Sequence, residues 1–382
     1  MSTLTPFTRS KRASKASMQG FSIIEIMVGM VIGLLTLLAI YQLYTTSEGR
    51  RRTVVSTSQA QSTGALALFA IERDIRSAGI GFASMDTAYL GCSVQASNSK
   101  RSPVAFQFPL QPVQIINGNE LRVLTGSSGN MFVGARYSAS NGGEFSMLKT
   151  NAGFQAGDIA IGTSDTDQGK CLMMEVTRGV GAVVTQQGGG APEPYLGVDH
   201  KVAGTYTNYY TGANAVATHN GSQNNILDGG ASALGEGFLY SLGPTPSLNV
   251  WSVSNNQLMR FNWLEEATNT KNMAVAEDVM QMAAEYGFDS NGNGVIDGTD
   301  EWTASDSSIA TPNLSKVIAV RVAILVRSSQ FERDAVTTEA PRWANGNKTF
   351  SMGAGSSDWQ HYRYRVYESV IPLRNTIWGQ MK

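Results

Sequence analysis

A single carboxylate, Glu25, lies inside an apolar run that extends from Phe21 to Tyr44. A charge within a membrane-spanning helix costs roughly 2.5–3.5 kcal/mol on insertion scales, so we expect a partner for this carboxylate. Four basic residues precede the run, at Arg9, Lys11, Arg12 and Lys15. Because Lys and Arg mark the cytoplasmic side of a membrane helix, we expect the chain after the run to lie outside the cytoplasm.

The flanks of this run indicate where a leader would be removed. A secretory signal peptide is cut after its apolar core at an A-x-A-like triplet, and residues 45–52 contain none. A small residue, Gly20, lies before the core instead. Cleavage between Gly20 and Phe21 would remove the leader 1–20 and create an amine about one helical turn from Glu25. That amine, in the same chain or a neighbouring one, would be the charge partner. The alternative is a plain membrane anchor with Glu25 at the lipid headgroups.

Residues 289–300, DSNGNGVIDGTD, have the spacing of a calcium-binding loop. In this template alternate oxygens surround a hard cation and a glycine makes the sharp turn. The expected Ca²⁺ ligands are Asp289, Asn291, Asn293, the Val295 carbonyl, Asp297 and Asp300. Asp300 is one methylene shorter than the bidentate Glu of the template, and Glu301 is out of register by one residue, so we expect weak affinity. The alternative is an Asn/Gly turn that binds no metal.

The chain has two cysteines, Cys92 and Cys171, both after the apolar run. In an oxidising compartment we expect one disulfide between them, and two buried thiols are the alternative. The three histidines, His200, His219 and His361, lie in unrelated contexts, and no HExxH, G-x-S-x-G or CxxC motif occurs. We expect His200 and His219 on a solvated loop and predict that the protein is not an enzyme.

Charge gives no indication of a nucleic-acid partner, because the formal net charge is −1. Aromatic and arginine side chains alternate over residues 359–367, a pattern that could suggest nucleic-acid binding. A half-exposed strand explains the same spacing. We therefore predict no specific nucleic-acid partner.

We expect one helix over about residues 21–78, which would contain Phe21 and Glu25. Residues 21–44 contain no proline and have transmembrane length, and Gly29 and Gly33 would let another helix approach closely. Residues 45–80 predict an amphipathic continuation of the helix. Its apolar side chains recur at three- and four-residue spacing at Leu68, Ile71, Ile75 and Ala78. Gly79 follows as a stop signal.

The remaining residues, 81–382, predict a β-rich head. Forty glycines and 15% charged residues suit turn-rich β structure. Strand candidates are residues 121–124, 158–161 and 170–176, a hairpin over 249–263 that turns at Asn255-Asn256, and residues 317–326 and 362–372. Residues 186–236 have few large apolar side chains, so we expect a long surface insertion there. The predicted fold class is α+β, a long helix packed on a β-rich head.

The N-terminal residues resemble the prepilin signature of the type IV pilin superfamily, a short basic leader followed by Gly, Phe, Ser or Thr, two aliphatics and Glu. The matching residues are Gly20, Phe21, Ser22, Ile23, Ile24 and Glu25. Blocks at 71–79, 286–289, 320–328 and 370–375 are similar to those of PilW-type minor pilins. The resemblance implies a pilin-like fold, cleavage after Gly20, N-methylation of Phe21 and a role for Glu25 in assembly.

The resemblance further implies a minor pilin that primes type IV pilus assembly at the filament tip and contributes to motility, adhesion or DNA uptake. Its expected partners are other minor pilins, the major pilin, the prepilin peptidase, the inner-membrane assembly platform and a tip adhesin. Before assembly we expect the protein to lie in the inner membrane with its head in the periplasm. After assembly we expect it in the pilus fibre. One alternative is a J-type minor pseudopilin of type II secretion. Another is a membrane-anchored calcium-binding adhesin that never polymerises.

Overall fold

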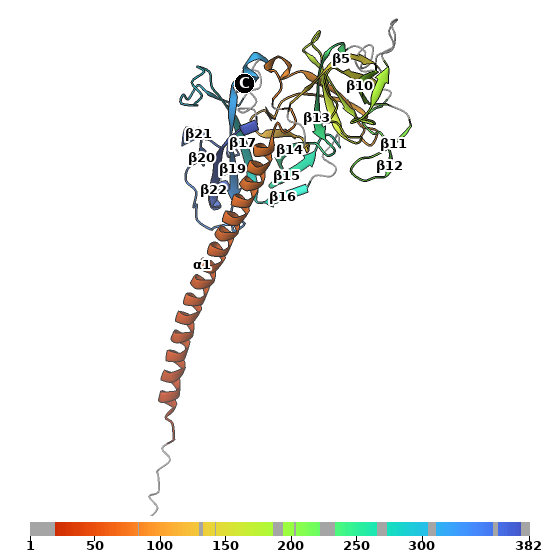
Figure 1. Cartoon of the computed structure of the whole chain (residues 1–382). Coiled ribbons are helices and arrows are strands. Elements are labelled where there is room, and N and C mark those ends of the chain that lie inside the picture. Colours follow the sequence, from red (N-terminus) through yellow and green to blue (C-terminus); the bar gives the residue numbers. More distant parts are fainter. Residues whose placement is uncertain are drawn as a thin grey trace, which may run out of the picture. The chain divides into compact units, whose positions relative to one another are not determined.

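The computed structural model describes residues 20–82, 84–129, 133–141, 143–185, 194–201, 204–221, 234–265, 273–304, 311–353 and 358–375. By its internal contacts the chain divides into two units, residues 1–55 and residues 56–382, and each is considered by itself. A long apolar helix followed by several β-sheets confirms the predicted α+β class (Figure 1).

Helix α1 (Ile23–Ser77) contributes to both units. In the second unit one face of this helix is buried, and its members recur at three- and four-residue spacing. They are Ser56, Ala60, Gly64, Ala67, Ile71 and Ile75. The predicted stripe is therefore correct at Ile71 and Ile75, and Leu68 packs against the same core while only partly buried. The buried face also continues toward the N-terminus through small residues, which let the helix approach the sheets closely.

Helix α1 ends where two glycines take a left-handed conformation. Gly79 and Gly81 have φ of 81° and 94°, a region that glycine enters without steric cost. The Gly79 N–H donates to the Leu124 carbonyl at 2.9 Å. The Asn375 side-chain amide donates to the carbonyl of Ala78 at 2.9 Å. The bond to Ala78 satisfies a carbonyl at the helix end, where the last carbonyls lack intrahelical partners. The bond from Gly79 joins the segment after the helix to Leu124.

Asp74 joins the buried side of helix α1 to a strand of the head. Its two carboxylate oxygens accept hydrogen bonds from the Asn249 side chain at 2.9 Å and from the Trp251 indole N–H at 2.7 Å. Burial raises the pKa of Asp74, and these two hydrogen bonds act in the opposite direction. Asp74 thus supplies a directional contact within an otherwise apolar surface.

Two sheets pack with helix α1 around one core. Within the described residues, the first has the order β16 (Met273–Glu277), β15 (Gln257–Asn262), β14 (Ser247–Ser254), β4 (Glu120–Thr125) and β3 (Val113–Ile116). The second has the order β18 (Trp302–Thr303), β17 (Val279–Phe288), β19 (Val317–Arg327) and β22 (Tyr364–Pro372). Their shared core includes Ile71, Trp251, Tyr286 and Ile324.

The strand predictions for these two sheets are confirmed. The β14–β15 hairpin turns at Asn255 and Asn256, which have φ of 52° and 60°, as a two-residue hairpin turn requires. Strand β19 is interior, since it pairs with β17 on one side and β22 on the other. Strand β22 alternates partly and forms an edge of the described sheet.

A larger sheet forms the other part of the head. Its described strands have the order β2 (Ala105–Pro109), β1 (Ser93–Ser97), β8 (Lys170–Glu175), β7 (Ile159–Thr163), β13 (Gly237–Gly243), β5 (Ala135–Asn141), β6 (Glu144–Met147), β10 (Pro194–Asp199) and β9 (Val183–Thr185). Strands β1 and β8 pair in parallel. In Figure 1 the strands β14–β16 lie between β19 and β13. Leu124 and Leu248 of the five-stranded sheet accordingly pack into the core beneath β13.

The expected surface insertion at 186–236 is only partly described, since residues 186–193, 202–203 and 222–233 lie outside the described residues. Its described part contains strand structure that we did not predict. Strand β10 pairs with β6 and β9 within the large sheet, and β11 (Thr205–Thr207) pairs with β12 (Asn214–Val216). Val198 is fully buried in a core with Phe145. The short segment that contains Val198 therefore forms a strand of the large sheet, although few large apolar side chains surround it in the sequence.

A small hairpin, β20 (Arg342–Trp343) with β21 (Lys348–Thr349), adjoins a buried charge cluster. Glu285 on β17 is fully buried and pairs with Arg321 at 3.3 Å and with Lys348. The Arg321 guanidinium also lies 3.7 Å from the centre of the Trp302 ring. Because breaking a buried ion pair leaves an uncompensated charge, this cluster constrains how β17, β19 and the hairpin fit together.

The first prediction concerns the close approach at Gly64. A Cβ atom there would lie 2.2 Å from Cε2 of Tyr367. We expect Gly64→Ala to destabilise the second unit by about 1–3 kcal/mol, the usual cost of overpacking a core. The measurement is thermal unfolding of the full chain in detergent, followed by circular dichroism.

Gly49→Ala is the matched control, because Gly49 lies in the same helix and an added Cβ would meet nothing within 4 Å. Alanine there should be neutral or stabilising, by about 0.5–1 kcal/mol. In a double-mutant cycle, Tyr367→Ala should remove most of the penalty of Gly64→Ala. Equal melting temperatures for Gly64→Ala and wild type would contradict the proposed contact.

Candidate functional site

The predicted cleavage and assembly residues lie just before helix α1 and in its first turn. Gly20 precedes helix α1, and a Cβ there would meet no atom within 4 Å. Phe21 is 79% exposed, and Glu25 is exposed in the first turn of α1. A carboxylate in the first turn of a helix interacts favourably with the helix dipole. The leader residues 1–19 lie outside the described residues.

Helix α1 presents an apolar surface along its N-terminal part. Its large apolar side chains from Ile23 to Tyr44 are exposed, and α1 is long and apolar enough to cross a membrane. Added Cβ atoms at Gly29 and Gly33 would meet nothing within 4 Å. An apolar surface of this extent indicates contact with lipid or with other proteins.

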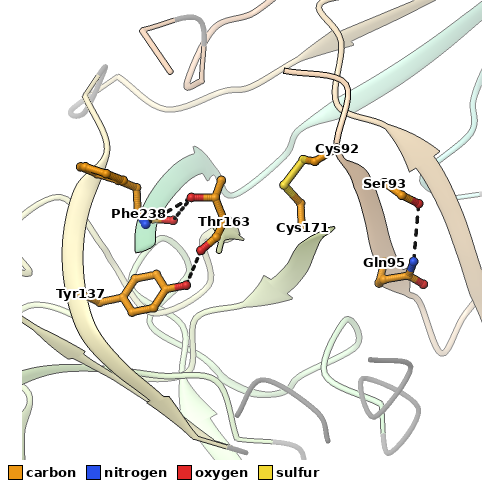
Figure 2. Close-up of a disulfide and its surroundings, with 7 residues drawn as sticks. All are labelled: Cys92, Ser93, Gln95, Tyr137, Thr163, Cys171 and Phe238. Atoms are coloured by element: carbon orange, nitrogen blue, oxygen red, sulfur yellow. Dashed lines mark hydrogen bonds between the residues drawn. A yellow bond between two sulfur atoms is a disulfide. The ribbon is translucent and has the colours of Figure 1, made fainter. Parts of the chain in front are cut away.

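The predicted disulfide is present and joins Cys92 to Cys171 on β8 (Figure 2). Their Cα atoms are 5.8 Å apart, and 79 positions separate them in the sequence. Both side chains are buried in the core beneath β1, β7 and β8. The crosslink therefore ties the segment that follows helix α1 to the interior of the large sheet.

A hydrogen-bonded junction lies near the disulfide in the same sheet (Figure 2). The Thr163 hydroxyl donates to the Phe238 carbonyl and accepts from the Phe238 N–H, each at 3.2 Å. The Tyr137 hydroxyl donates to the Thr163 carbonyl. Burial raises the pKa of Tyr137, so its hydroxyl stays protonated as a donor.

The segment predicted to bind calcium forms a loop after β17, and Asp289 closes one side of it. The Oδ1 atom of Asp289 accepts from the Gly292 and Asn293 N–H groups at 2.7 and 3.0 Å, and Oδ2 accepts from Gly294 N–H at 2.7 Å. Asn291 Oδ1 likewise accepts from the Asn293 N–H at 2.9 Å. The oxygens of Asp289 and Asn291 therefore accept from backbone N–H groups of the same loop.

Glu301, which we expected to be out of register, closes the other side of this loop. Its Oε1 accepts from the N–H and hydroxyl of Ser290, and its Oε2 accepts from the Asp297 and Gly298 N–H groups, all within 3.1 Å. The backbone N–H groups of Gly298 and Asp297 lower the pKa of Glu301 to about 2. Asp300 is exposed.

These hydrogen bonds decide how well the loop suits a cation. A carboxylate has about four lone-pair sites, and the four bonds to Glu301 occupy them, so Glu301 has no free acceptor for a metal. Asp289 retains one site, and Asp297 accepts only from the Asn293 side-chain amide among the described groups, at 3.1 Å. Within the described residues, no three His, Cys, Asp or Glu side chains group as a metal site. The loop as described closes through its own hydrogen bonds, and calcium binding stays a prediction.

The histidine expectation is wrong for His200, which is 2% exposed and lies 5.0 Å from the Phe145 ring. Its position directly after β10 carries it into the head. His219 is partly buried and lies 3.3 Å from Glu175. The contact between His219 and Glu175 was not predicted. Three tyrosines, at 206, 209 and 210, stand out in that segment of small residues and could have indicated ordered structure there.

The aromatic and arginine side chains around β22 make contacts within the head. Arg327 lies 4.2 Å from the centre of the Tyr362 ring, and Arg365 lies 5.8 Å from that of Tyr367. Phe331 stacks on His361 at 4.9 Å. These contacts are those of a half-exposed strand whose side chains pack on its neighbours.

Comparison with known proteins adds one finding. A family model described as Type IV Pilus-assembly protein W matches residues 247–375. The chain is thus similar to a type IV pilus-assembly protein. The match covers about a third of the chain, from β14 to the end of the described head. No curated protein and no solved structure matched.

The second prediction tests calcium at the loop after β17. The motif predicts that calcium raises the melting temperature of the full chain relative to a chelator. The gain follows RT ln(1 + [L]/Kd), about 2.7 kcal/mol when calcium is a hundred times Kd. Asp297→Asn should reduce the gain, because it removes a charged ligand and retains an oxygen that accepts from Asn293.

Asp297→Asn is preferable to Asp289→Ala, which would also remove three hydrogen bonds that close the loop. Asp300→Glu tests the template itself, since restored bidentate reach should increase the calcium-dependent gain. Identical melting in calcium and chelator at millimolar levels would identify the loop as a turn without a metal.

Proposed function

We propose that this chain is a minor pilin, made as a prepilin, that primes the assembly of type IV pili and lies at the filament tip. The observation that carries the proposal is the pilus-assembly match at residues 247–375 in a chain whose N-terminal helix is apolar enough to cross a membrane. The match supports a relation to type IV pili. Cleavage, priming and the tip position rest on the N-terminal signature and on the resemblance.

The proposed mechanism begins with membrane insertion. The apolar part of helix α1 holds the subunit in the inner membrane with the head in the periplasm. The prepilin peptidase cuts after Gly20, and the new N-terminus at Phe21 is methylated. The amine of one subunit then pairs with Glu25 of a neighbour, which offsets the cost of a carboxylate in an apolar environment.

Assembly replaces lipid by helices of other subunits around the exposed apolar surface of α1. Gly29 and Gly33 suit such contacts, because small residues let helices approach closely. The expected partners are other minor pilins, the major pilin, the inner-membrane platform and a tip adhesin. The head, which contains the disulfide and the matched region, would remain outside the helical core of the fibre.

A gene deletion distinguishes pilus assembly from type II secretion. If the proposal is correct, deletion removes or strongly reduces surface pili and leaves secreted enzymes in the medium. Retained pili with enzymes trapped in the periplasm would instead support the J-type pseudopilin. A normal phenotype in both assays would favour a non-polymerising adhesin.

The third prediction concerns processing. We expect mass spectrometry of the mature protein to find an N-terminus at Phe21 that carries one methyl group. A bulky residue in Gly20→Leu should block cleavage, whereas Gly29→Leu, inside the helix, should not. An intact Met1, or a cut after Tyr44, would contradict the proposal.

The fourth prediction concerns Glu25. Glu25→Val should preserve insertion and cleavage, because it makes the helix more apolar, but should reduce recovery of the protein in sheared pili by about tenfold or more, as expected for loss of a desolvated charge pair. Glu48→Val is a matched control on the same helix, because Glu48 pairs with Arg52 at an exposed site at 3.4 Å. Normal recovery of Glu25→Val would show that Glu25 does not align the subunits.

A further inference from the structure

A cleft of about 730 Å³ lies in the part of the head that the pilus-assembly match does not cover. It is lined by residues 177–180 after β8, by Asp199 and Lys201 at the end of β10, and by residues 204–209 and Gly212 around the β11–β12 hairpin, which Figure 1 labels. Its volume is typical of small-molecule sites. Neither the proposed assembly role nor the calcium loop uses it.

The wall formed by the hairpin is fixed by two tyrosine hydroxyls. Tyr206 on β11 donates to Glu175 at 2.5 Å, and Tyr210 donates to Asp158 at 2.5 Å. Between them the N–H of Tyr209 donates to the Ala156 carbonyl at 2.9 Å. The backbone that carries Tyr209 is therefore held on both sides.

The acceptor of the first bond stays ionised over a wide pH range. Burial by itself would raise the pKa of Glu175, but hydrogen bonds from His219, Tyr206 and the Thr218 N–H outweigh it and lower this pKa to about 2. Burial and the neighbouring Glu175 raise the pKa of Tyr206 to about 12. Donor and acceptor thus keep their roles at every physiological pH.

Asn208 fixes the turn beside Tyr209. Its Oδ1 accepts from the Tyr210 and Thr211 N–H groups at 2.9 and 3.1 Å. Its side-chain amide lies against Gly157, where an added Cβ would come within 2.3 Å of Nδ2. The loop is consequently organised before any ligand binds.

The Tyr209 side chain differs from its two neighbours. The residue is 62% exposed, and its ring contacts the Tyr210 ring edge-on, with centroids 5.3 Å apart at 89°. Tyr206 and Tyr210 direct their hydroxyls into the protein, whereas Tyr209 presents a ring beside the cleft. A rigid, exposed tyrosine offers contact area at low entropic cost.

The polar wall of the cleft has two cations that share one carboxylate. Asp199 has a side chain only 3% exposed, and its Oδ2 lies 2.9 Å from Arg178 Nε and 3.6 Å from Lys201 Nζ. Its Oδ1 is buried without a hydrogen bond from the described residues. Arg178 and Lys201 remain about half exposed, so their other N–H groups are available to a ligand.

We propose that this cleft binds an oligosaccharide. A sugar ring has a C–H face that can lie against an aromatic ring and hydroxyls on its edge that accept from cations and donate to carboxylates. Tyr209 supplies the first surface, and Arg178 and Lys201, which the buried Asp199 holds in place, supply the second. An apolar ligand would leave these charged groups without partners. A nucleic-acid strand would require more cations than two that share a carboxylate.

The test uses the purified full chain in a detergent without a sugar headgroup, applied to a printed array of bacterial, plant and animal oligosaccharides. We expect retention on a subset of related glycans. Titration of the best array glycan should then give an affinity that Tyr209→Ala weakens about tenfold or more, the usual loss on truncating a central aromatic contact. Tyr209→Trp should retain binding, since it keeps an aromatic face.

Phe331→Ala is the matched control, because Phe331 is a half-exposed aromatic residue outside the cleft. It should leave binding unchanged, and all variants should melt like the wild type. No retention on the array, or retention that Tyr209→Ala does not weaken, would overturn the proposal. Since binding is measured on the isolated chain, its failure would leave the assembly role untouched, and a failure of assembly would not affect it.

Discussion

The burial of one face of helix α1 against two sheets is the interaction on which the second unit depends. Small residues from Ser56 to Ala67 bring the helix axis close to the sheets, and Ile71 and Ile75 fill the space beyond them. Apolar contacts alone would allow the helix to slide along its axis. Asp74 opposes this, because its bonds to Asn249 and Trp251 require one register.

The two parts of helix α1 satisfy opposite constraints. In the second unit a narrow stripe is buried, and the other faces carry mostly polar side chains together with the exposed Leu66 and Phe69. In the N-terminal unit apolar side chains are exposed around the whole helix, as suits a lipid or an intersubunit environment. Glu25 is the exception within that apolar part. Under the proposed function, the cost of burying its charge would favour a partner subunit that binds in one position.

Features set by local periodicity were predictable from the sequence. The helix, the Asn255-Asn256 turn and the long strand β19 follow from spacing, turn chemistry and β-branched composition. Pairings between distant segments were not predictable in this way, and these pairings determine the order of strands in the sheets. Strand β10 forms by pairing with β6 and β9. Composition does not contain this pairing, and it therefore predicted a loop for the segment. Likewise, Glu301 enters the loop after β17 because the chain turns at Gly298, which a linear template does not represent.

Different strands hold the region matched to the pilus-assembly family and the cleft. The match spans β14 to β22, which include the strands that hold helix α1. The cleft rests instead on Glu175 and Asp158, whose neighbours belong to the large sheet. We therefore expect a change at Tyr209 to alter neither the register of the helix nor the buried Glu285–Arg321 pair. This separation would let the cleft surface vary in the ligand it accepts while the sheets that hold helix α1 keep the geometry on which the proposed assembly role depends.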